Sequence, residues 1–123
     1  MKTHSGNVVQ LAVALAALAL NLSVIQPAKA SFFTNGTPLN SARWGHTTTL
    51  LNNGQVLVVG GSDNSGALCE AELYDPATGI WTTSSPNTAR MNHTATLLPN
   101  GTVLVAGGTS DGVTPLASAE LYQ

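Results

Sequence analysis

The chain contains one nineteen-residue segment twice, and this repetition constrains its fold more than any other feature. Residues 43–61 return as residues 90–108, 47 positions later, with thirteen of the nineteen positions identical. A second block, residues 71–74, returns as residues 119–122 at a spacing of 48. Repeats of this length are supersecondary units that bury their apolar faces by stacking on one another. The sequence therefore predicts an array of similar units.

The first thirty residues have the layout of a secretory signal peptide. A short polar stretch with Lys2 precedes a Leu/Ala/Val run at residues 8–20, and the small residues Ala28 and Ala30 stand where a signal peptidase reads. The run is shorter than the roughly 20 residues of a membrane-spanning helix, so retention as an anchor is the less favoured alternative. We expect cleavage after Ala30, a secreted or periplasmic protein, and no membrane association in the mature form.

The mature chain, residues 31–123, carries few basic groups. Its strong cations are Arg43 and Arg90, which stand against six carboxylates and give a net charge of −4. Nucleic-acid binding needs clustered Lys and Arg to displace phosphate counterions, so we exclude nucleic acid as a partner. Cys69 is the single cysteine, which precludes an intrachain disulfide, and we interpret it as a small core residue.

The pattern within each repeat predicts β-strands. Residues 46–51 are Thr-rich, and an Asn-Gly pair separates them from an apolar run at residues 56–59. This arrangement predicts a hairpin with a tight primed turn, in which both central residues have positive φ. The apolar run is expected of a strand buried on both faces. A polar loop at residues 62–66 then leads to predicted strands at residues 71–74 and 80–82.

Four antiparallel strands in a repeat of this length form one blade of a β-propeller, so we predict an all-β fold. Repeat 1 covers about residues 43–82 and repeat 2 about residues 90–123. An outer strand is expected at about residues 32–34, with Phe33 in the position that Trp81 holds in repeat 1. Because propellers have about four to eight blades, two blades predict an incomplete ring.

These residues resemble the kelch repeat, in the version found in galactose-oxidase-like propellers. The resemblance rests on the apolar run before a double glycine, on a Tyr and a Trp with six residues between them, and on the Arg-x-x-His-Thr opening of each copy. It covers nearly all of the mature chain. The repeat residues that it marks as structural are Arg43, His46, Gly60, Gly61, Glu72, Tyr74, Trp81, Arg90, His93, Gly107, Gly108, Glu120 and Tyr122.

The resemblance assigns no residue to catalysis, to a cofactor or to a metal. It places one His in each repeat, which suggests hydrogen bonding within the blade, whereas catalytic zinc typically takes three converging protein ligands. Each repeated Arg is expected to pair with the Glu that recurs with it, or with backbone carbonyls. The loops at residues 63–66 and 110–112 lack calcium-loop spacing, so we interpret them as solvated turns.

Galactose oxidase itself holds copper with Tyr and His ligands and crosslinks a cysteine to one ligand tyrosine. Tyr74 and Tyr122 occupy the structural Tyr position of the repeat, so no catalytic residue of that enzyme is carried over to this chain. We expect a binding or scaffold module without catalytic activity, whose loops contact a protein or carbohydrate ligand. The alternative is the remnant of a galactose-oxidase-like copper enzyme whose catalytic blades lie outside this chain.

Two explanations account for a chain with two blades. It is a fragment of a longer reading frame, or it self-associates into a closed ring. In the second case the strand at residues 32–34 of one chain completes the sheet that contains residues 119–122 of the next. Three such chains would supply the blades of a ring within the usual size of about four to eight.

Overall fold

The computed structural model describes residues 31–84 and 88–123 of the chain. All regular structure in these residues is antiparallel β-sheet, as the sequence predicts, and it lies within one compact unit, Asn35–Gln123. No helix in the described part of the chain is long and apolar enough to cross a membrane. The signal peptide predicted at residues 1–30 lies outside the described residues. The strands are β1 (Thr47–Leu50), β2 (Val56–Val59), β3 (Ser62–Asp63), β4 (Gly66–Ala67), β5 (Ala71–Asp75), β6 (Ile80–Ser84), β7 (Thr94–Leu97), β8 (Val103–Ala106) and β9 (Ala119–Tyr122).

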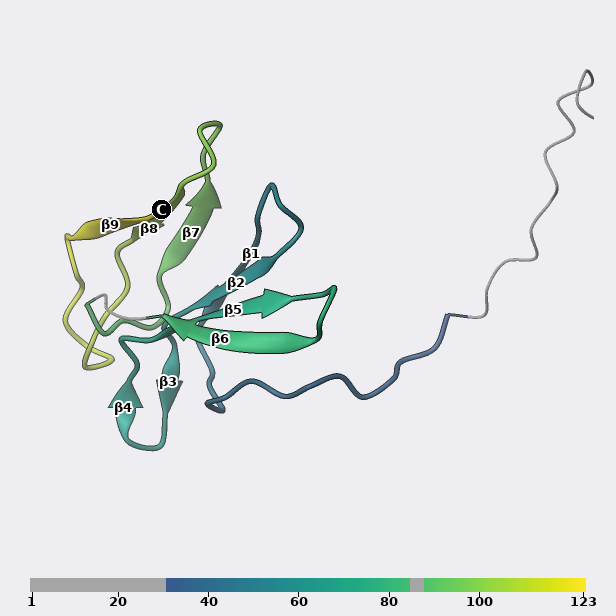
Figure 1. Ribbon diagram of the computed structural model, residues 1–123. Helices are drawn as coiled ribbons and strands as arrows, with labels where there is room; N and C mark the ends of the chain where they lie inside the picture. Colours follow the sequence, from purple (N-terminus) through teal and green to yellow (C-terminus); the bar gives the residue numbers. More distant parts are fainter. Residues whose placement is uncertain (1–30, 85–87) are drawn as a thin grey trace, which may run out of the picture. The chain divides into compact units, whose positions relative to one another are not determined.

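The longer strands of each repeat form one sheet (Figure 1). The first sheet, which we call blade 1, has the strand order β1-β2-β5-β6, and the second, blade 2, has the order β7-β8-β9. Their registers are equivalent: Leu57 of β2 lies opposite Leu73 of β5, and Leu104 of β8 lies opposite Leu121 of β9. The strands predicted at residues 71–74 and 80–82 are therefore present as β5 and β6.

The hairpins β1–β2 and β7–β8 are present, but the prediction of a primed two-residue turn is wrong. Leu51 N–H donates to the carbonyl of Gln55 (2.8 Å), and Gly54 N–H donates to the carbonyl of Leu51 (3.0 Å). Gly54 has a φ of 86°, whereas the φ of Asn53 is not positive. The connection is a three-residue loop in which a left-handed glycine follows a β-turn. The Asn53 carboxamide oxygen accepts the Gln55 N–H (3.0 Å), a local bond that needs no left-handed backbone at Asn53.

The polar loop after β2 contains a further hairpin, β3–β4, that the sequence pattern did not predict. Ser62, the first residue of β3, exchanges two backbone hydrogen bonds with Trp44 (3.0 and 2.8 Å). In repeat 2 the equivalent Thr109 makes isolated bridges to Met91 and Pro115. Strands of two residues show no periodicity, so a contact with a distant segment, here Trp44, decides whether they form.

The outer strand predicted at about residues 32–34 is absent from the single chain, because residues 31–39 have no regular secondary structure. A strand needs a hydrogen-bonded neighbour, and the Phe33 side chain is fully exposed. The following residues instead bind the edge of blade 1. The Thr37 hydroxyl donates to the carbonyl of Gly79 (2.6 Å), and the Trp81 indole N–H donates to the carbonyl of Thr37 (3.0 Å).

The apolar core lies between the two blades. Residues opposite one another in an antiparallel pair share a face of the sheet, which places Leu57, Val59 and Ala71 together on blade 1, and Val103 and Val105 together on blade 2. These five residues are buried in one cluster, so we call the faces that carry them the inner faces. The residues that extend the cluster are Leu51, Leu73, Ala95, Leu97 and Tyr122.

Burial on both faces holds for β2 but not for β8. In β2, Val58 is as buried as its neighbours Leu57 and Val59, although it points to the opposite, outer face of blade 1. In β8 the buried positions alternate with the half-buried Leu104 and Ala106, which point to the outer face of blade 2. The two copies of the strand therefore differ in what covers their second face.

Candidate functional site

A buried ion pair closes blade 1. One guanidinium nitrogen of Arg43, Nη2, contacts the Glu72 carboxylate, and both side chains are fully buried. Nη1 of the same guanidinium donates to the carbonyls of Gly60 (2.9 Å) and Glu70 (3.2 Å). The Glu72 carboxylate also accepts the backbone N–H groups of Asn40 (2.7 Å) and Ser41 (3.1 Å). The pair thus joins β5 to the end of β2 and to the segment that leads into β1.

Blade 2 contains the equivalent pair in a more open setting. Arg90 donates to the Glu120 carboxylate (3.1 Å) and to the carbonyls of Gly107 (2.7 Å) and Ser118 (3.2 Å). Glu120 accepts the backbone N–H of Thr88 (3.0 Å) and its hydroxyl (2.9 Å), but 29% of its side chain is exposed. Both pairs expected from the recurrence of Arg and Glu are therefore present, and the backbone carbonyls are bound as well.

The surroundings of Glu120 favour its ionised form. Partial burial by itself raises the pKa of Glu120, but the hydrogen bonds from Thr88 and the charge of Arg90 outweigh it, so the pKa lies below its ordinary value. A carboxylate held in this way binds groups of its own blade.

Of the two repeated histidines, His93 binds the adjacent blade. His93 is buried, and its Nε2 shares a hydrogen bond with the Thr47 hydroxyl of blade 1 (2.8 Å), while its Nδ1 has no partner among the described residues. Burial, followed by the charges of Arg90 and His46, lowers the pKa of His93. Within residues 31–84 and 88–123, no three His, Cys, Asp or Glu side chains come together in a geometry that would hold a metal ion.

The double glycines allow close backbone contacts. A Cβ on Gly61 would lie 2.7 Å from the Trp44 carbonyl oxygen, and one on Gly108 would lie 2.5 Å from the Met91 carbonyl oxygen. Both glycines have positive φ. A Cβ on Gly60 would contact the Arg90 carbonyl of blade 2 even more closely, whereas one on Gly107 would meet only the Leu116 carbonyl at 3.8 Å. Gly60 therefore lies at the junction between the blades.

Tyr74 and Trp81 form an aromatic pair on the outer face of blade 1, with ring centroids 4.8 Å apart. Pairs of this kind stabilise a sheet edge, and the Trp81 indole N–H is bound by Thr37. Tyr122 holds the position of Tyr74 in blade 2 and extends the core between the blades. Neither tyrosine points to a cluster of possible metal ligands among the described residues.

The loops with clustered oxygen atoms use those oxygens for their own turns. Asp111 accepts the N–H groups of Thr114 (2.7 Å) and Val113 (2.8 Å) and the hydroxyls of Thr114 and Thr109 (both 2.8 Å). The backbone hydrogen bonds from Thr114 and Val113, and then these hydroxyls, lower the pKa of Asp111. In the other loop, Asp63 accepts the N–H of Ser65 (2.7 Å).

The interpretation of Cys69 as a core residue is wrong, because its side chain is exposed. The connection between β4 and β5 is fixed through backbone atoms on either side of it. Leu68 N–H binds the Gly61 carbonyl (2.8 Å), and Gly60 N–H binds the Glu70 carbonyl (3.0 Å). This anchoring leaves the side chain between them pointing outward.

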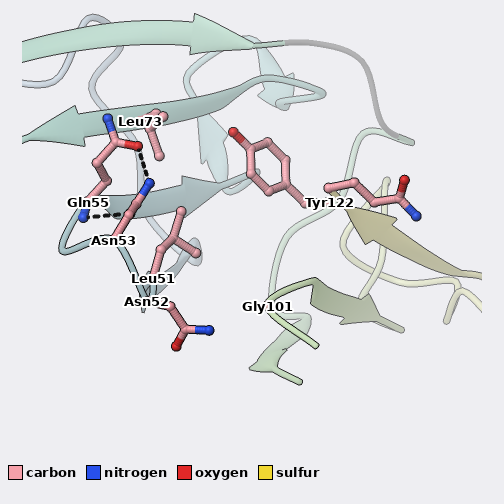
Figure 2. Close-up of a pocket in the computed structure, with 8 residues that line it drawn as sticks. Leu51, Asn52, Asn53, Gln55, Leu73, Gly101 and Tyr122 are labelled. Atoms are coloured by element: carbon pink, nitrogen blue, oxygen red, sulfur yellow. Dashed lines mark hydrogen bonds between the residues drawn. The ribbon is translucent and has the colours of Figure 1, made fainter. Parts of the chain in front are cut away.

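A pocket of about 320 Å³ opens between the hairpin loops and the end of β9 (Figure 2). Amide side chains and a tyrosine surround an apolar floor, and Gln55 and Asn53 are hydrogen-bonded to each other (2.8 Å). Sequence reasoning missed this pocket, because its two sides come from different repeats. The lining residues are Leu51, Asn52, Asn53, Gln55, Leu73, Gly101, Tyr122 and Gln123.

Comparison with known proteins identifies part of this architecture. Residues 43–88 match the family model of the kelch motif, which supports the kelch repeat expected in this part of the chain. The match includes all of blade 1 and ends at Thr88, which binds Glu120. No curated protein sequence matches the chain. The antiparallel sheets of the described residues, which close no barrel, are consistent with kelch blades in an incomplete ring, and a kelch repeat indicates a protein-binding or scaffold module.

Proposed function

We propose that the chain is an exported, non-catalytic binding module of the galactose-oxidase-like kelch type, and that its partners include further copies of itself. The observation that supports this best is the contrast between polar and apolar groups. The repeated Arg and Glu side chains bind groups of their own blade, and His93 binds Thr47 of the adjacent blade. Large apolar side chains such as Leu50 and Leu121, by contrast, are exposed on the outer faces. Apolar surface of this kind favours association with protein.

The enzyme alternative is tested with copper. The purified chain is dialysed against Cu²⁺, and bound copper and galactose-dependent release of hydrogen peroxide are measured. We expect no stoichiometric copper and no peroxide. Stoichiometric copper that disappears in both His46→Asn and His93→Asn, together with peroxide release, would instead favour the remnant of a copper oxidase.

Export is tested at the N-terminus. The apolar run and the small residues at Ala28 and Ala30 support cleavage after Ala30, so N-terminal sequencing of the exported protein is expected to begin at Ser31. An Ala30→Arg variant, which places a bulky charge at the cleavage position, is expected to remain uncut. An N-terminus at Met1 in the membrane fraction would contradict the proposal.

Self-association is tested by sedimentation velocity over a hundredfold range of concentration. In the proposed ring, the segment around Phe33 pairs with β9 of a neighbouring chain, and three chains close the ring. The open edge of β9, which pairs only with β8 among the described residues, supports this arrangement. We expect a discrete trimer that is lost when residues 31–37 are deleted. A wild-type monomer at all concentrations would refute self-association, and polydisperse material would favour a fragment.

A carbohydrate ligand is a second candidate, favoured by the pocket in Figure 2. Planar amides beside an aromatic ring and an apolar floor supply both hydrogen bonds and an apolar contact. Glycan-array binding followed by titration calorimetry tests it. Binding is expected to fall in Asn52→Ala and to persist in Asn64→Ala, which changes an exposed amide in the β3–β4 turn outside the pocket. Equal loss in both variants, or no glycan bound, would rule out the pocket as a carbohydrate site.

A further inference from the structure

The contact between blades 1 and 2 shows how one repeat packs on the next. Beside the apolar core, it contains hydrogen bonds that cross from blade to blade. Three join backbone groups: Gly61 N–H to Arg90 C=O (2.9 Å), Arg90 N–H to Leu68 C=O (3.3 Å) and Asn92 N–H to Gly45 C=O (2.8 Å). The fourth is shared by the Thr47 hydroxyl and His93 Nε2 (2.8 Å).

Blade 2 packs on the inner face of blade 1. The outer face of blade 2 carries the equivalent side chains, but the described residues leave that face uncovered. Its Leu104, Ala119 and Leu121 are the repeat equivalents of Leu57, Ala71 and Leu73. Leu57 and Ala71 are buried, at 0% and 4% exposed. Leu104 is half-buried, Ala119 is exposed, and Leu121 is 53% exposed. Since the side chains are alike, the difference in burial comes from what covers them.

The outer face of blade 1 shows the complementary difference. Its Leu50 is 65% exposed, whereas the repeat equivalent Leu97 packs against the core between the blades. Val56 is half-buried, whereas its equivalent Val103 is fully buried. The segment that begins at Thr37 binds this face at β6 and, through Asn40 and Ser41, at Glu72 of β5. Val58 opposite Glu72 is buried, whereas Leu50 at the far end of the face stays exposed. The outer face of blade 2 is thus the equivalent of the inner face of blade 1, and the outer face of blade 1 is the equivalent of the inner face of blade 2.

The backbone groups repeat this relationship. Gly108 is the equivalent of Gly61, and Arg43 is the equivalent of Arg90. Gly61 N–H binds Arg90 C=O, but neither Gly108 N–H nor Arg43 C=O has a hydrogen-bond partner among the described residues. Charge does not oppose burial of the two outer faces, because the described strands that form them expose no unpaired charge. Glu72 on blade 1 is neutralised by Arg43.

We propose that a second copy of the chain docks the outer face of its blade 1 on the outer face of blade 2, in the geometry by which blade 2 docks on blade 1. This rests on the self-association proposed above and names its surfaces. Gly108 N–H then binds Arg43 C=O of the second copy, the Thr94 hydroxyl binds its His46, and Leu121 packs beside its Val56. Because the two faces differ, the contact is head-to-tail and repeats until the ring closes.

Two charge substitutions test the two faces separately. Leu121→Asp damages the outer face of blade 2, and Leu50→Asp damages the outer face of blade 1. Each variant alone contains no undamaged pair of faces, so association is expected to weaken about 10- to 100-fold, the equivalent of one lost Leu burial. Val113→Asp, at an 86% exposed loop position outside both faces, is the matched control and is expected to associate as the wild type does.

Mixing the two variants separates this geometry from any other. A Leu50→Asp chain keeps an undamaged blade 2 face, and a Leu121→Asp chain keeps an undamaged blade 1 face, so an equimolar mixture is expected to form one-to-one dimers and no larger species. Circular dichroism and tryptophan fluorescence establish that each variant is folded, and sedimentation velocity measures the species.

Each outcome bears on the proposal. Dimers in the mixture, with monomers in each variant alone, support it. A wild-type oligomer that both substitutions leave intact refutes these faces while self-association stands. Two monomeric variants that do not combine refute the head-to-tail geometry. A wild-type monomer refutes self-association and the docking together.

Discussion

The two Arg–Glu pairs form a matched experiment within one chain, because they hold equivalent positions and differ in exposure. Arg43 and Glu72 are fully buried, whereas 29% of the Glu120 side chain is exposed. Replacing Glu72 with Gln removes the charge and leaves the Arg43 guanidinium buried without a counter-ion. Breaking a buried pair in this way costs about 3–5 kcal/mol. The same change at Glu120 is expected to cost less, about 1 kcal/mol, because Arg90 is buried but solvent reaches the Glu120 side chain and screens its charge.

Urea denaturation monitored by tryptophan fluorescence measures both costs at one protomer concentration. A domain is stable by about 5–15 kcal/mol, so Glu72→Gln removes a large share of the total. If the urea midpoint of Glu72→Gln lies too close to zero denaturant to be measured, all variants are compared in the same concentration of sucrose, which favours the compact state. The double variants with Arg43→Met or Arg90→Met complete a cycle that isolates the coupling between the partners.

We expect a coupling of about 2 kcal/mol or more for Arg43 and Glu72, and less than about 1 kcal/mol for Arg90 and Glu120. In Arg43→Met/Glu72→Gln the Gln carbonyl still accepts a backbone N–H, so the double variant is expected to be more stable than Glu72→Gln. Equal couplings in the two blades would refute the reasoning, since the difference is expected from the exposure of Glu120.

Two further predictions concern backbone strain and pH. Gly54→Ala and Gly60→Ala both place a side chain at positive φ, but only the second meets the Arg90 carbonyl. Urea midpoints are expected to give a cost of about 1 kcal/mol for Gly54→Ala and about 1–3 kcal/mol more for Gly60→Ala; equal midpoints would contradict the close contact between the blades. Because the pKa of His93 is lowered in the folded state, its contribution to stability is complete above the unfolded pKa of about 6.5 and is lost as the pH falls below it. Unfolding measured from pH 7.5 to 5 is expected to show a steeper loss in the wild type than in His93→Asn, and parallel curves would contradict it.

Local pattern and repetition predicted the strands and the ion pairs. The apolar run at residues 56–59 and the Thr-rich run before it became β2 and β1 because their neighbours in the sheet are adjacent in sequence. The pairing of Arg43 with Glu72 followed from their recurrence, since two residues that repeat together in a blade share its hydrogen bonds. These features depend on contacts within one repeat.

The features that the sequence did not predict depend on contacts between segments or on fine backbone geometry. The hairpin β3–β4 forms where Ser62 meets Trp44, and Cys69 is exposed because backbone bonds fix the residues around it. The Asn-Gly pair predicted a hairpin correctly. Whether the loop had two or three residues depended on the Leu51–Gln55 hydrogen bond, which the dipeptide does not encode.

Repetition in sequence also does not imply repetition in burial. Leu57 and Leu104 occupy the same position of the repeat and have the same register, yet only Leu57 is fully buried. The alternation of a strand decides which face a residue shares, whereas the next blade decides whether that face is covered. The same repeat position can therefore pack against the next blade of the chain in one blade and against a separate molecule in the other. For this reason the exposed leucines of the outer faces, rather than the repeated polar residues, are the positions at which this chain is expected to recognise a partner.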